Sequence, residues 1–325
     1  MSYKILVTGS AGFIGSHLVE ELIRQGYNVR AFVRYNARND WGWLQTVSCL
    51  KNIEIYTGDI RDYDSVRNAV RGVEVIFHLA ALIGIPYSYI SPLAYIKANI
   101  EGTYNVLQAA REEGVQRVVH TSTSEVYGTA RYVPINEEHP LQAQSPYAAT
   151  KIAADQLALS FHRSFGLPVV VVRPFNTFGP RQSARAVIPT IITQVLAGNW
   201  TVRLGNLSPT RDFNYVRDTV SGMLAVGLSE RTVGQVVNIG SGRETSIKDL
   251  VEQIGNIMGR EISVEQEDIR VRPALSEVDR LLCDNRKAYK LAGWTPRYTL
   301  EEGLRETIQW FRENLYLYKP DLYNV

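Results

Sequence analysis

The sequence has few of the residues from which metal centres and disulfide frameworks are built. Its only two cysteines, Cys49 and Cys283, lie far apart and lack the spacing of zinc ligands, so we expect free thiols, no metal site and a reducing compartment. No apolar run approaches the ~20 residues that a membrane-spanning helix needs. The first residues lead directly into an apolar segment rather than a signal or transit peptide. We therefore predict a cytoplasmic protein.

The sequence also lacks an excess of charge of one sign. Its 35 lysines and arginines nearly balance its 33 aspartates and glutamates, giving a net charge of +2 over 325 residues. The charges are interspersed rather than gathered in a basic stripe, which argues against nucleic acid as a partner but not against an anionic small molecule. With 45% hydrophobic residues, the chain should fold into one large or two moderate domains.

The chain opens with the pattern of a dinucleotide-binding turn. An apolar run over residues 4–8 is followed by glycines at three-residue spacing and by an apolar-periodic segment over 13–25, which predicts a strand, a turn and a helix. Glycines at such a turn let the backbone approach a pyrophosphate, and the helix N-terminus holds its negative charge. The predicted cofactor contacts are Gly9, Gly12, Phe13, Ile14 and Gly15.

Short apolar segments alternate with helical ones along most of the chain. Strands are expected at 28–33, 53–57, 75–79, 117–121, 169–173 and 236–239. This alternation predicts an α/β fold with a parallel, doubly wound sheet, whose ligands bind beyond the carboxyl ends of the strands. Residues at those ends are expected to contact the cofactor: Asp59, Ile60, Leu79, Ala80 and Ala81.

The end of the second strand indicates which dinucleotide binds. An acidic residue there would bind the adenosine ribose of NAD, whereas an arginine accommodates the 2′-phosphate of NADP. Val33 is followed here by Arg34, so the sequence favours NADP and leaves NAD as the alternative.

Local signals place further features. Ser91 with Pro92 is expected to cap a helix, and Ser246 with Asp249 and Thr299 with Glu302 have the spacing of capping boxes. His78 is expected to be a hydrogen-bonded histidine at a strand end rather than a catalytic base.

A tyrosine and a lysine four residues apart form the candidate catalytic pair. Ser145 is a suitable N-cap and Pro146 suits the first helical position, so Tyr147 and Lys151 should share one face of a helix. A phenol has a pKa near ~10, and a neighbouring cation favours the phenolate, which would make Tyr147 a general base. Thr123, Ser124 and Glu125 follow the strand 117–121 and should lie at the same edge of the sheet.

Arginines recur in loops of the second half of the chain. Forked guanidinium groups suit the oxygens of a diphosphate, and an apolar stretch from Val187 could wall a slot beside them. The predicted substrate contacts are Asn176, Arg181, Arg185, Val187, Arg211 and Arg272. We expect a dinucleotide-binding domain over 1–178 with late strands at about 211–240, and a smaller interleaved substrate lobe over about 179–210 and 241–325.

Together these motifs resemble the extended short-chain dehydrogenase/reductase family, in its nucleotide-sugar epimerase and dehydratase branch. The resemblance covers essentially the whole chain. It is carried by residues 8–15, 59–60 and 78–81, Asn99, residues 123–128, Tyr147 with Lys151, and residues 173–176, 179–181 and 211–213. Residues 32–43 and 179–193 further resemble the dehydratases of legionaminic-type nonulosonate pathways.

The resemblance implies a Rossmann fold with Asn99 and Thr121 beside the cofactor. It also implies a homodimer in which the helices around 99–113 and 147–165 pack as a four-helix bundle.

The resemblance further implies a reaction. Tyr147 would deprotonate the sugar C4 hydroxyl as hydride leaves C4 for the nicotinamide, with Lys151 holding the nicotinamide ribose and lowering the tyrosine pKa, and Thr123 bonding the C4 oxygen. Glu125 would then remove the C5 proton, water would leave from C6, and hydride would return to C6. This is the 4,6-dehydration of a UDP- or GDP-linked hexose or N-acetylhexosamine.

Several alternatives stay open. Ser124 stands where dehydratases for thymidine-diphosphoglucose carry an aspartic acid, and Thr-Ser-Glu instead resembles the GDP-mannose 4,6-dehydratases. With Arg211, the same triplet resembles UDP-glucuronate decarboxylases. A 4-epimerase, an enzyme acting on a later 4-keto or 5,6-ene sugar, and a non-catalytic dinucleotide sensor are the other candidates. The residues decide neither the base of the nucleotide nor the substituent at C2.

Overall fold

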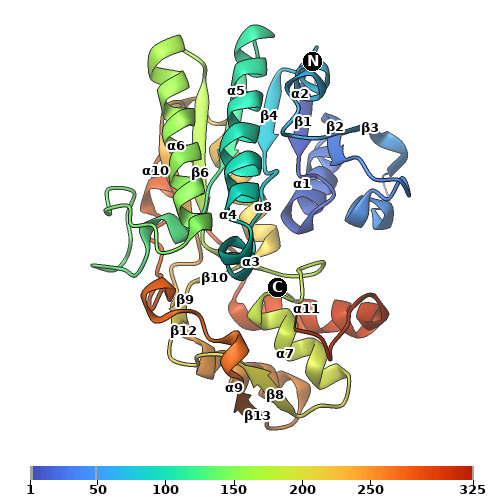
Figure 1. Cartoon of the computed structure of the whole chain (residues 1–325), viewed down its shortest axis with the longest axis vertical. Coiled ribbons are helices and arrows are strands. Elements are labelled where there is room, and N and C mark those ends of the chain that lie inside the picture. Colours follow the sequence, from blue (N-terminus) through green and yellow to red (C-terminus); the bar gives the residue numbers. More distant parts are fainter. Residues whose placement is uncertain (1–2, 48–49, 324–325) are drawn as a thin grey trace.

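Seven parallel strands form the central sheet of the computed structural model, which describes residues 3–47 and 50–323 (Figure 1). Their order is β11-β6-β5-β4-β1-β2-β3. The strands are β1 (Lys4–Thr8), β2 (Asn28–Arg34), β3 (Ile53–Gly58), β4 (Val75–His78), β5 (Arg117–Thr121), β6 (Val169–Pro174) and β11 (Val236–Ile239). The predicted doubly wound α/β fold is confirmed. Because the order reverses between β1 and β4, a crevice for a ligand is expected beyond their carboxyl ends.

Helices cover both faces of this sheet, so its strands are buried on both sides. On β1, Ile5 and Val7 belong to the core that contains α1 (Phe13–Arg24) and α8 (Val216–Leu228). Leu6 points to the opposite core, which contains α2 (Tyr63–Val70), α5 (Gly102–Glu112) and α6 (Pro146–Phe165). Burial on two faces explains why these strands read as continuous apolar runs, and why each predicted strand agrees with the structure to within one residue.

A smaller lobe lies beyond the carboxyl ends of the strands, in the lower part of Figure 1. It contains α7 (Val187–Leu196), α9 (Ile247–Met258), α11 (Leu300–Asn314), the parallel pair β8 (Thr201–Leu204) and β13 (Ser263–Gln266), and the antiparallel pair β9 (Thr210–Arg211) and β12 (Thr245–Ser246). The short parallel pair β7 (Asn176–Phe178) and β10 (Phe213–Tyr215) connects the sheet to this lobe. The predicted domain bounds stay a prediction. They assign α10 (Arg286–Ala292) to the lobe, but this helix packs on α8 and on β11 of the central sheet.

The helix starts depend on short polar caps. Ser145 accepts a hydrogen bond from the backbone N–H of Ala148 and Pro146 occupies the first turn of α6, as predicted. Thr299 and Glu302 form a complete capping box at α11, and Ser246 caps α9 through the N–H of Asp249.

Ser91 occupies the N-cap position of α4 (Pro92–Tyr95) with Pro92 after it, as predicted, but it does not cap the helix through its side chain. Ser91 is also the last residue of the turn that ends α3 (Ile85–Ile90). Its ψ of 59° departs from the extended backbone that places a capping oxygen over the first turn.

The cysteines and the helix lengths bear on two further expectations from the sequence. Cys283 is a free, buried thiol, as predicted, and burial raises its pKa; Cys49 lies outside the described residues. None of the helices in the described ranges combines the length and hydrophobicity of a membrane span.

Candidate functional site

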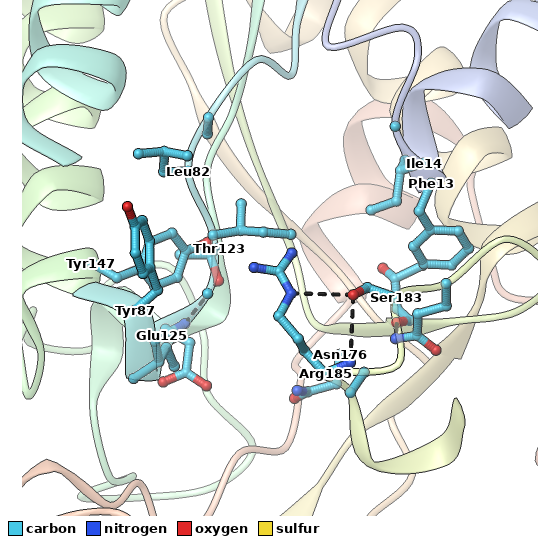
Figure 2. A pocket seen from close by; sticks show the side chains of 18 of the residues that line it. Phe13, Ile14, Leu82, Tyr87, Thr123, Glu125, Tyr147, Asn176, Ser183 and Arg185 are labelled. Atoms are coloured by element: carbon cyan, nitrogen blue, oxygen red, sulfur yellow. Dashed lines mark hydrogen bonds between the residues drawn. The ribbon is translucent and has the colours of Figure 1, made fainter. Parts of the chain in front are cut away.

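A cavity of about 1060 Å³ extends along the carboxyl ends of the strands and against the lobe. Figure 2 shows part of its lining. Most of the predicted site residues lie on its walls: Gly9, Gly12, Phe13, Ile14, Gly15, Arg34, Asp59, Ile60, Leu79, Ala80, Ala81, Thr121, Thr123, Ser124, Glu125, Tyr147, Lys151, Asn176, Arg185, Val187, Arg211 and Arg272. Two others, Asn99 and Arg181, do not line it.

The glycine turn after β1 has the shape that a pyrophosphate requires. Gly9 has a φ of 69°, and a Cβ on it would lie 2.8 Å from the backbone N of Ala80. A Cβ on Gly15 would lie 2.2 Å from the carbonyl oxygen of Gly9, so only glycine fits at either position. Gly12 is the N-cap residue of α1 and has no side chain to cap the helix. The N–H groups of the first turn are therefore left for an anion.

The Thr8 hydroxyl holds the residues that follow β4, which lie against the glycine turn. It accepts hydrogen bonds from the backbone N–H groups of Leu79 and Ala80, both at 3.1 Å. It also bonds the Nδ1 of His78 at 2.8 Å, while the Nε2 of His78 bonds Thr103. His78 is therefore a hydrogen-bonded, buried histidine, as predicted, and the residues after β4 are held against the cavity.

Unpaired polar atoms of the lining support a ligand in this cavity. Among the described residues of the lining, Thr121 Oγ1, Asn176 Oδ1, Gln182 Oε1 and Arg272 Nη1 are buried without a hydrogen-bond partner. The last atom lies 3.7 Å from a carboxylate oxygen of Glu277, which is an ion-pair distance but not a hydrogen bond. Buried polar atoms are normally paired, so these atoms suit contact with a polar ligand. The glycine turn and these atoms fit a dinucleotide lying beside a second polar molecule.

One wall of the cavity holds the candidate catalytic residues. The Thr123 hydroxyl accepts a hydrogen bond from the N–H of Glu125 at 3.2 Å and caps the short helix η4 (Ser124–Tyr127). Glu125 is only 8% exposed. Figure 2 shows Thr123, Glu125 and Tyr147 together, across the cavity from Phe13 and Ile14. A carboxylate, a phenol and a hydroxyl thus face one space.

The Tyr147–Lys151 pair lies on one face of α6, but its electrostatics differ from the prediction. The Nζ of Lys151 donates to the carbonyl oxygen of Thr121 at 2.7 Å, and burial lowers the lysine pKa to about 8. Burial raises the pKa of Tyr147, and the Thr123 hydroxyl opposes this only in part. The expected net lowering of the tyrosine pKa is therefore wrong, because burial penalises the phenolate more than the Thr123 hydroxyl stabilises it.

A buried aspartate, Asp155, lies one helical turn beyond Lys151. It is fully buried and accepts hydrogen bonds from Ser122 Oγ at 2.8 Å and from Arg173 Nε and Nη2 at 3.0 and 2.9 Å. The Nε2 of His120 lies 3.3 Å from its other oxygen. Its charge raises the pKa of Lys151 against the effect of burial. Sequence analysis missed Asp155, although its four-residue spacing from Lys151 places both on one helix face.

Asn99 lies in the π-helix η3 (Ile96–Glu101), behind the cavity wall. Its amide bonds both the N–H and the carbonyl of Leu82, at 2.8 and 3.0 Å, and donates to the Thr150 hydroxyl at 3.0 Å. Asn99 therefore does not line the cavity, where it was predicted to contact the cofactor. Asn99 instead holds Leu82, which lines the cavity, against α6.

Arg181 also differs from its predicted place. Its φ of 69° turns the side chain toward α1, where it pairs with Glu20 at 2.7 Å and donates to the Ser16 hydroxyl. This pair fixes the loop after β7 to α1. The guanidinium of Arg181 therefore points to α1 and does not line the cavity.

Arginines gather at the end of the cavity that faces the lobe. Arg211 and Arg272 lie 3.4 and 3.7 Å from the same oxygen of Glu277. Two guanidinium groups around one carboxylate leave net positive charge, which suits a diphosphate. Arg185 donates to Ser183 at 3.1 Å and reaches the turn after β4, because a Cβ on Gly84 would lie 2.6 Å from its Nη1.

Comparison with known proteins gives concordant matches. The family model described as GDP-mannose 4,6 dehydratase matches residues 6–307. The chain is 34% identical to the UDP-N-acetyl-alpha-D-glucosaminuronate decarboxylase of Bacillus cytotoxicus, covering 96% of this chain and 99% of that protein. It is 34% identical to the UDP-glucose 4-epimerase of Mycolicibacterium smegmatis, covering 95% and 98%. The solved dTDP-glucose 4,6-dehydratase DesIV of Streptomyces venezuelae, with NAD bound, matches with a TM-score of 0.90 and 32% identity, covering 98% and 99%.

The contact between Lys151 and Asp155 predicts a pKa effect. Asp155→Asn removes the negative charge that raises the Lys151 pKa. The pKa should then fall below its value of about 8 in the native protein, so Lys151 loses its proton at lower pH. NMR titration of ¹³C-labelled lysine, with the signal assigned through Lys151→Met, measures this shift.

Ser122→Ala is the matched control, because it removes a hydrogen bond to Asp155 without removing charge. It should leave the lysine titration in place. An unchanged titration in Asp155→Asn would show that the carboxylate does not support the charge of Lys151.

Proposed function

The chain belongs to the GDP-mannose 4,6-dehydratase family, within the nucleotide-sugar branch of the extended short-chain dehydrogenases/reductases, and on that premise we propose that it is a nucleotide-sugar 4,6-dehydratase. Relatives in this family include dehydratases, epimerases and decarboxylases. The proposed substrate is a UDP- or GDP-linked hexose or N-acetylhexosamine, and the product is its 4-keto-6-deoxy form.

The observation that carries this proposal is the position of Glu125. Its carboxylate is nearly buried on the wall that also holds Thr123 and Tyr147. Epimerisation at C4 requires removal and return of a hydride at C4 and of the hydroxyl proton, but no base at C5. Elimination of water from C6 requires removal of the C5 proton once C4 is a ketone, and a carboxylate beside the reacting sugar can take it.

The other residues suit the oxidation at C4. Tyr147 takes the proton of the C4 hydroxyl, and the Thr123 hydroxyl bonds the C4 oxygen. Burial raises the Tyr147 pKa, so the phenolate would need positive charge nearby. An oxidised nicotinamide bound in the cavity would supply that charge together with the hydride acceptor. Lys151 donates to the Thr121 carbonyl, and in the proposed mechanism its ammonium also holds the ribose of the nicotinamide. Asp155, one helical turn further along α6, stabilises the positive charge of that lysine.

The proposed cofactor is NAD rather than the NADP that Arg34 favours in the sequence. Arg34 does line the cavity, but Asp59 lies close enough for the two charges to interact. Arg61 donates two hydrogen bonds to Asp59 and holds its pKa at about 2, so this ionised carboxylate offsets part of the positive charge that would favour a 2′-phosphate. The NAD in the related DesIV structure supports the same choice. Mass spectrometry of the dinucleotide that copurifies with the protein distinguishes the two.

Decarboxylation of a nucleotide-linked uronate is the second candidate. Arg211 lies near enough to Glu125 for their charges to interact, so a guanidinium is available beside the proposed C5 base. Such a group would suit the carboxylate of a uronate. Glu277 already pairs with Arg211 at 3.4 Å, and this competing carboxylate favours the uncharged C6 hydroxymethyl group of a dehydratase substrate.

The proposed assembly is a homodimer through α5 and α6. These helices lie side by side (Figure 1) and expose Tyr104 and Phe165, at 45% and 49%. Exposed aromatic side chains on a helix pair suit packing against the same pair of a second copy. The molar mass of the protein in solution tests this.

The proposed reaction predicts a change in product mass. Incubation with UDP- and GDP-linked hexoses and N-acetylhexosamines, and with UDP-glucuronate, should remove one water from one of the first two classes. Loss of carbon dioxide from the uronate would instead favour the decarboxylase. Unchanged mass with inverted C4 stereochemistry would establish an epimerase and contradict the proposal.

The roles of Glu125 and Tyr147 predict different losses in two variants. Glu125→Gln should still reduce the cofactor when substrate binds, but should eliminate water roughly 10² to 10⁴ times more slowly. Tyr147→Phe should fail at both steps. Absorbance of the reduced nicotinamide follows the first step, and product mass follows the second.

The exposed Glu301→Gln variant, on the surface of α11, controls for loss of a carboxylate elsewhere. Equal losses of both partial reactions in Glu125→Gln would remove this residue from its role as the C5 base.

A further inference from the structure

A tyrosine at the end of the described chain forms part of the cavity wall. Tyr323 lines the cavity and is half-buried. The guanidinium of Arg270 lies 4.7 Å from the centre of its ring, in a cation–π contact, and also lines the cavity. Arg270 is fixed in turn by a 2.5 Å pair with Glu267. Tyr316, in the same tail, is 80% exposed and does not line the cavity, so of these two tail tyrosines Tyr323 is the one that faces the cavity.

The tail reaches this position because an aromatic cluster holds it. The Tyr318 ring packs on Phe311 and Trp310 of α11 and on Trp43 of the 3₁₀ helix η1 (Gly42–Thr46), with centroids 4.8, 6.2 and 6.4 Å apart. Its hydroxyl donates to the carbonyl of Gln182 at 2.9 Å. These contacts join the end of the chain to both halves of the molecule, and Tyr323 follows five residues later.

The wall formed by Tyr323 and Arg270 adjoins the arginines of the proposed diphosphate site. Glu277 contacts Arg272 and also lies 3.5 Å from the side-chain amide of Asn206. The neighbouring Gly205 packs directly on Arg270, since a Cβ there would lie 2.5 Å from the Arg270 carbonyl oxygen. All of these residues line the cavity. The tyrosine wall is therefore at the lobe end of the cavity, away from the glycine turn.

We propose that Tyr323, backed by Arg270, is the surface on which the base of the bound nucleoside diphosphate stacks. This rests on the proposed function only in requiring a nucleotide-linked substrate. A base is a flat aromatic group, and aromatic rings and guanidinium planes bind its face. With the diphosphate between Arg211 and Arg272, the base would extend toward Gly205 and Tyr323. The last residues of the described chain thus take part in substrate binding.

The proposal predicts a selective loss of nucleotide affinity. In the protein with its dinucleotide bound, Tyr323→Ala should weaken the binding of UDP or GDP by about tenfold. Tyr323→Phe, which keeps the ring, should bind as the wild type does, and so should Tyr316→Ala. Titration calorimetry measures these affinities. With substrate, Tyr323→Ala should raise KM by a similar factor and leave kcat unchanged.

Inorganic pyrophosphate is the internal control, because it occupies the arginines without a base. Its affinity should be the same in Tyr323→Ala and in the wild type. Equal weakening of pyrophosphate and nucleotide would show that the tyrosine only shapes the cavity, and unchanged nucleotide affinity would show that it does not contact the base. Either result overturns the stacking role while leaving the proposed function intact. Failure of the wild type to bind any nucleoside diphosphate would overturn both.

Discussion

The hydrogen bond from Lys151 to the carbonyl of Thr121 joins the two segments on which the site depends. One is α6, which carries Tyr147; the other is the end of β5, which leads to Thr123 and Glu125. A second hydrogen bond joins the same segments. Ser122, the residue after Thr121, donates to Asp155, one helical turn after Lys151. With both bonds formed, the phenol and the carboxylate have fixed positions relative to one another.

This arrangement requires several charges to be buried together. Lys151, Asp155 and Arg173 are each less than 5% exposed, and taking such groups out of water is costly unless they are paired. Arg173 supplies two hydrogen bonds to Asp155, and its third donor bonds the Tyr127 hydroxyl. Removal of one partner from a buried pair typically costs about 3–5 kcal/mol. These hydrogen bonds pair the buried charges, and of the three residues Lys151 is the one that lines the cavity.

The predictions that succeeded depend on local sequence. Buried parallel strands are apolar throughout, and Ser145-Pro146 is a cap that needs no information from elsewhere, so the strands and the start of α6 could be predicted closely. The position of Thr123, Glu125 and Tyr147 on the cavity wall could be predicted because each follows a strand or shares a helix face with another residue of recognisable chemistry. Their catalytic roles stay predictions.

Where the structure departs from the expected positions or pKa values, contacts between distant residues and burial are the cause. Arg181 pairs with Glu20, 161 residues earlier in the chain, and the left-handed backbone at Arg181 allows it. Asn99 bonds Leu82 and Thr150, which lie 17 and 51 residues away in the chain. The raised pKa of Tyr147 results from the depth of burial, which no spacing indicates. Tyr323 reaches the cavity through packing of Tyr318 on two separate parts of the fold.

Relatives named for three different reactions are similar to this chain over nearly its whole length. A dehydratase, a decarboxylase and an epimerase of nucleotide sugars share this fold at about one-third identity. In the proposed account, oxidation at C4 uses Thr123, Tyr147 and Lys151, and the fate of the 4-keto sugar depends on the group facing C5 and C6. Here that group is Glu125, with Arg211 nearby but paired to Glu277.

The most direct measurement follows a deuterium atom placed at C4 of the substrate sugar. The account predicts that it appears at C6 of the product, because the hydride taken from C4 is returned to the carbon that loses water. Deuterium returned to C4 would contradict the account, since both epimerisation and decarboxylation restore hydrogen at that carbon.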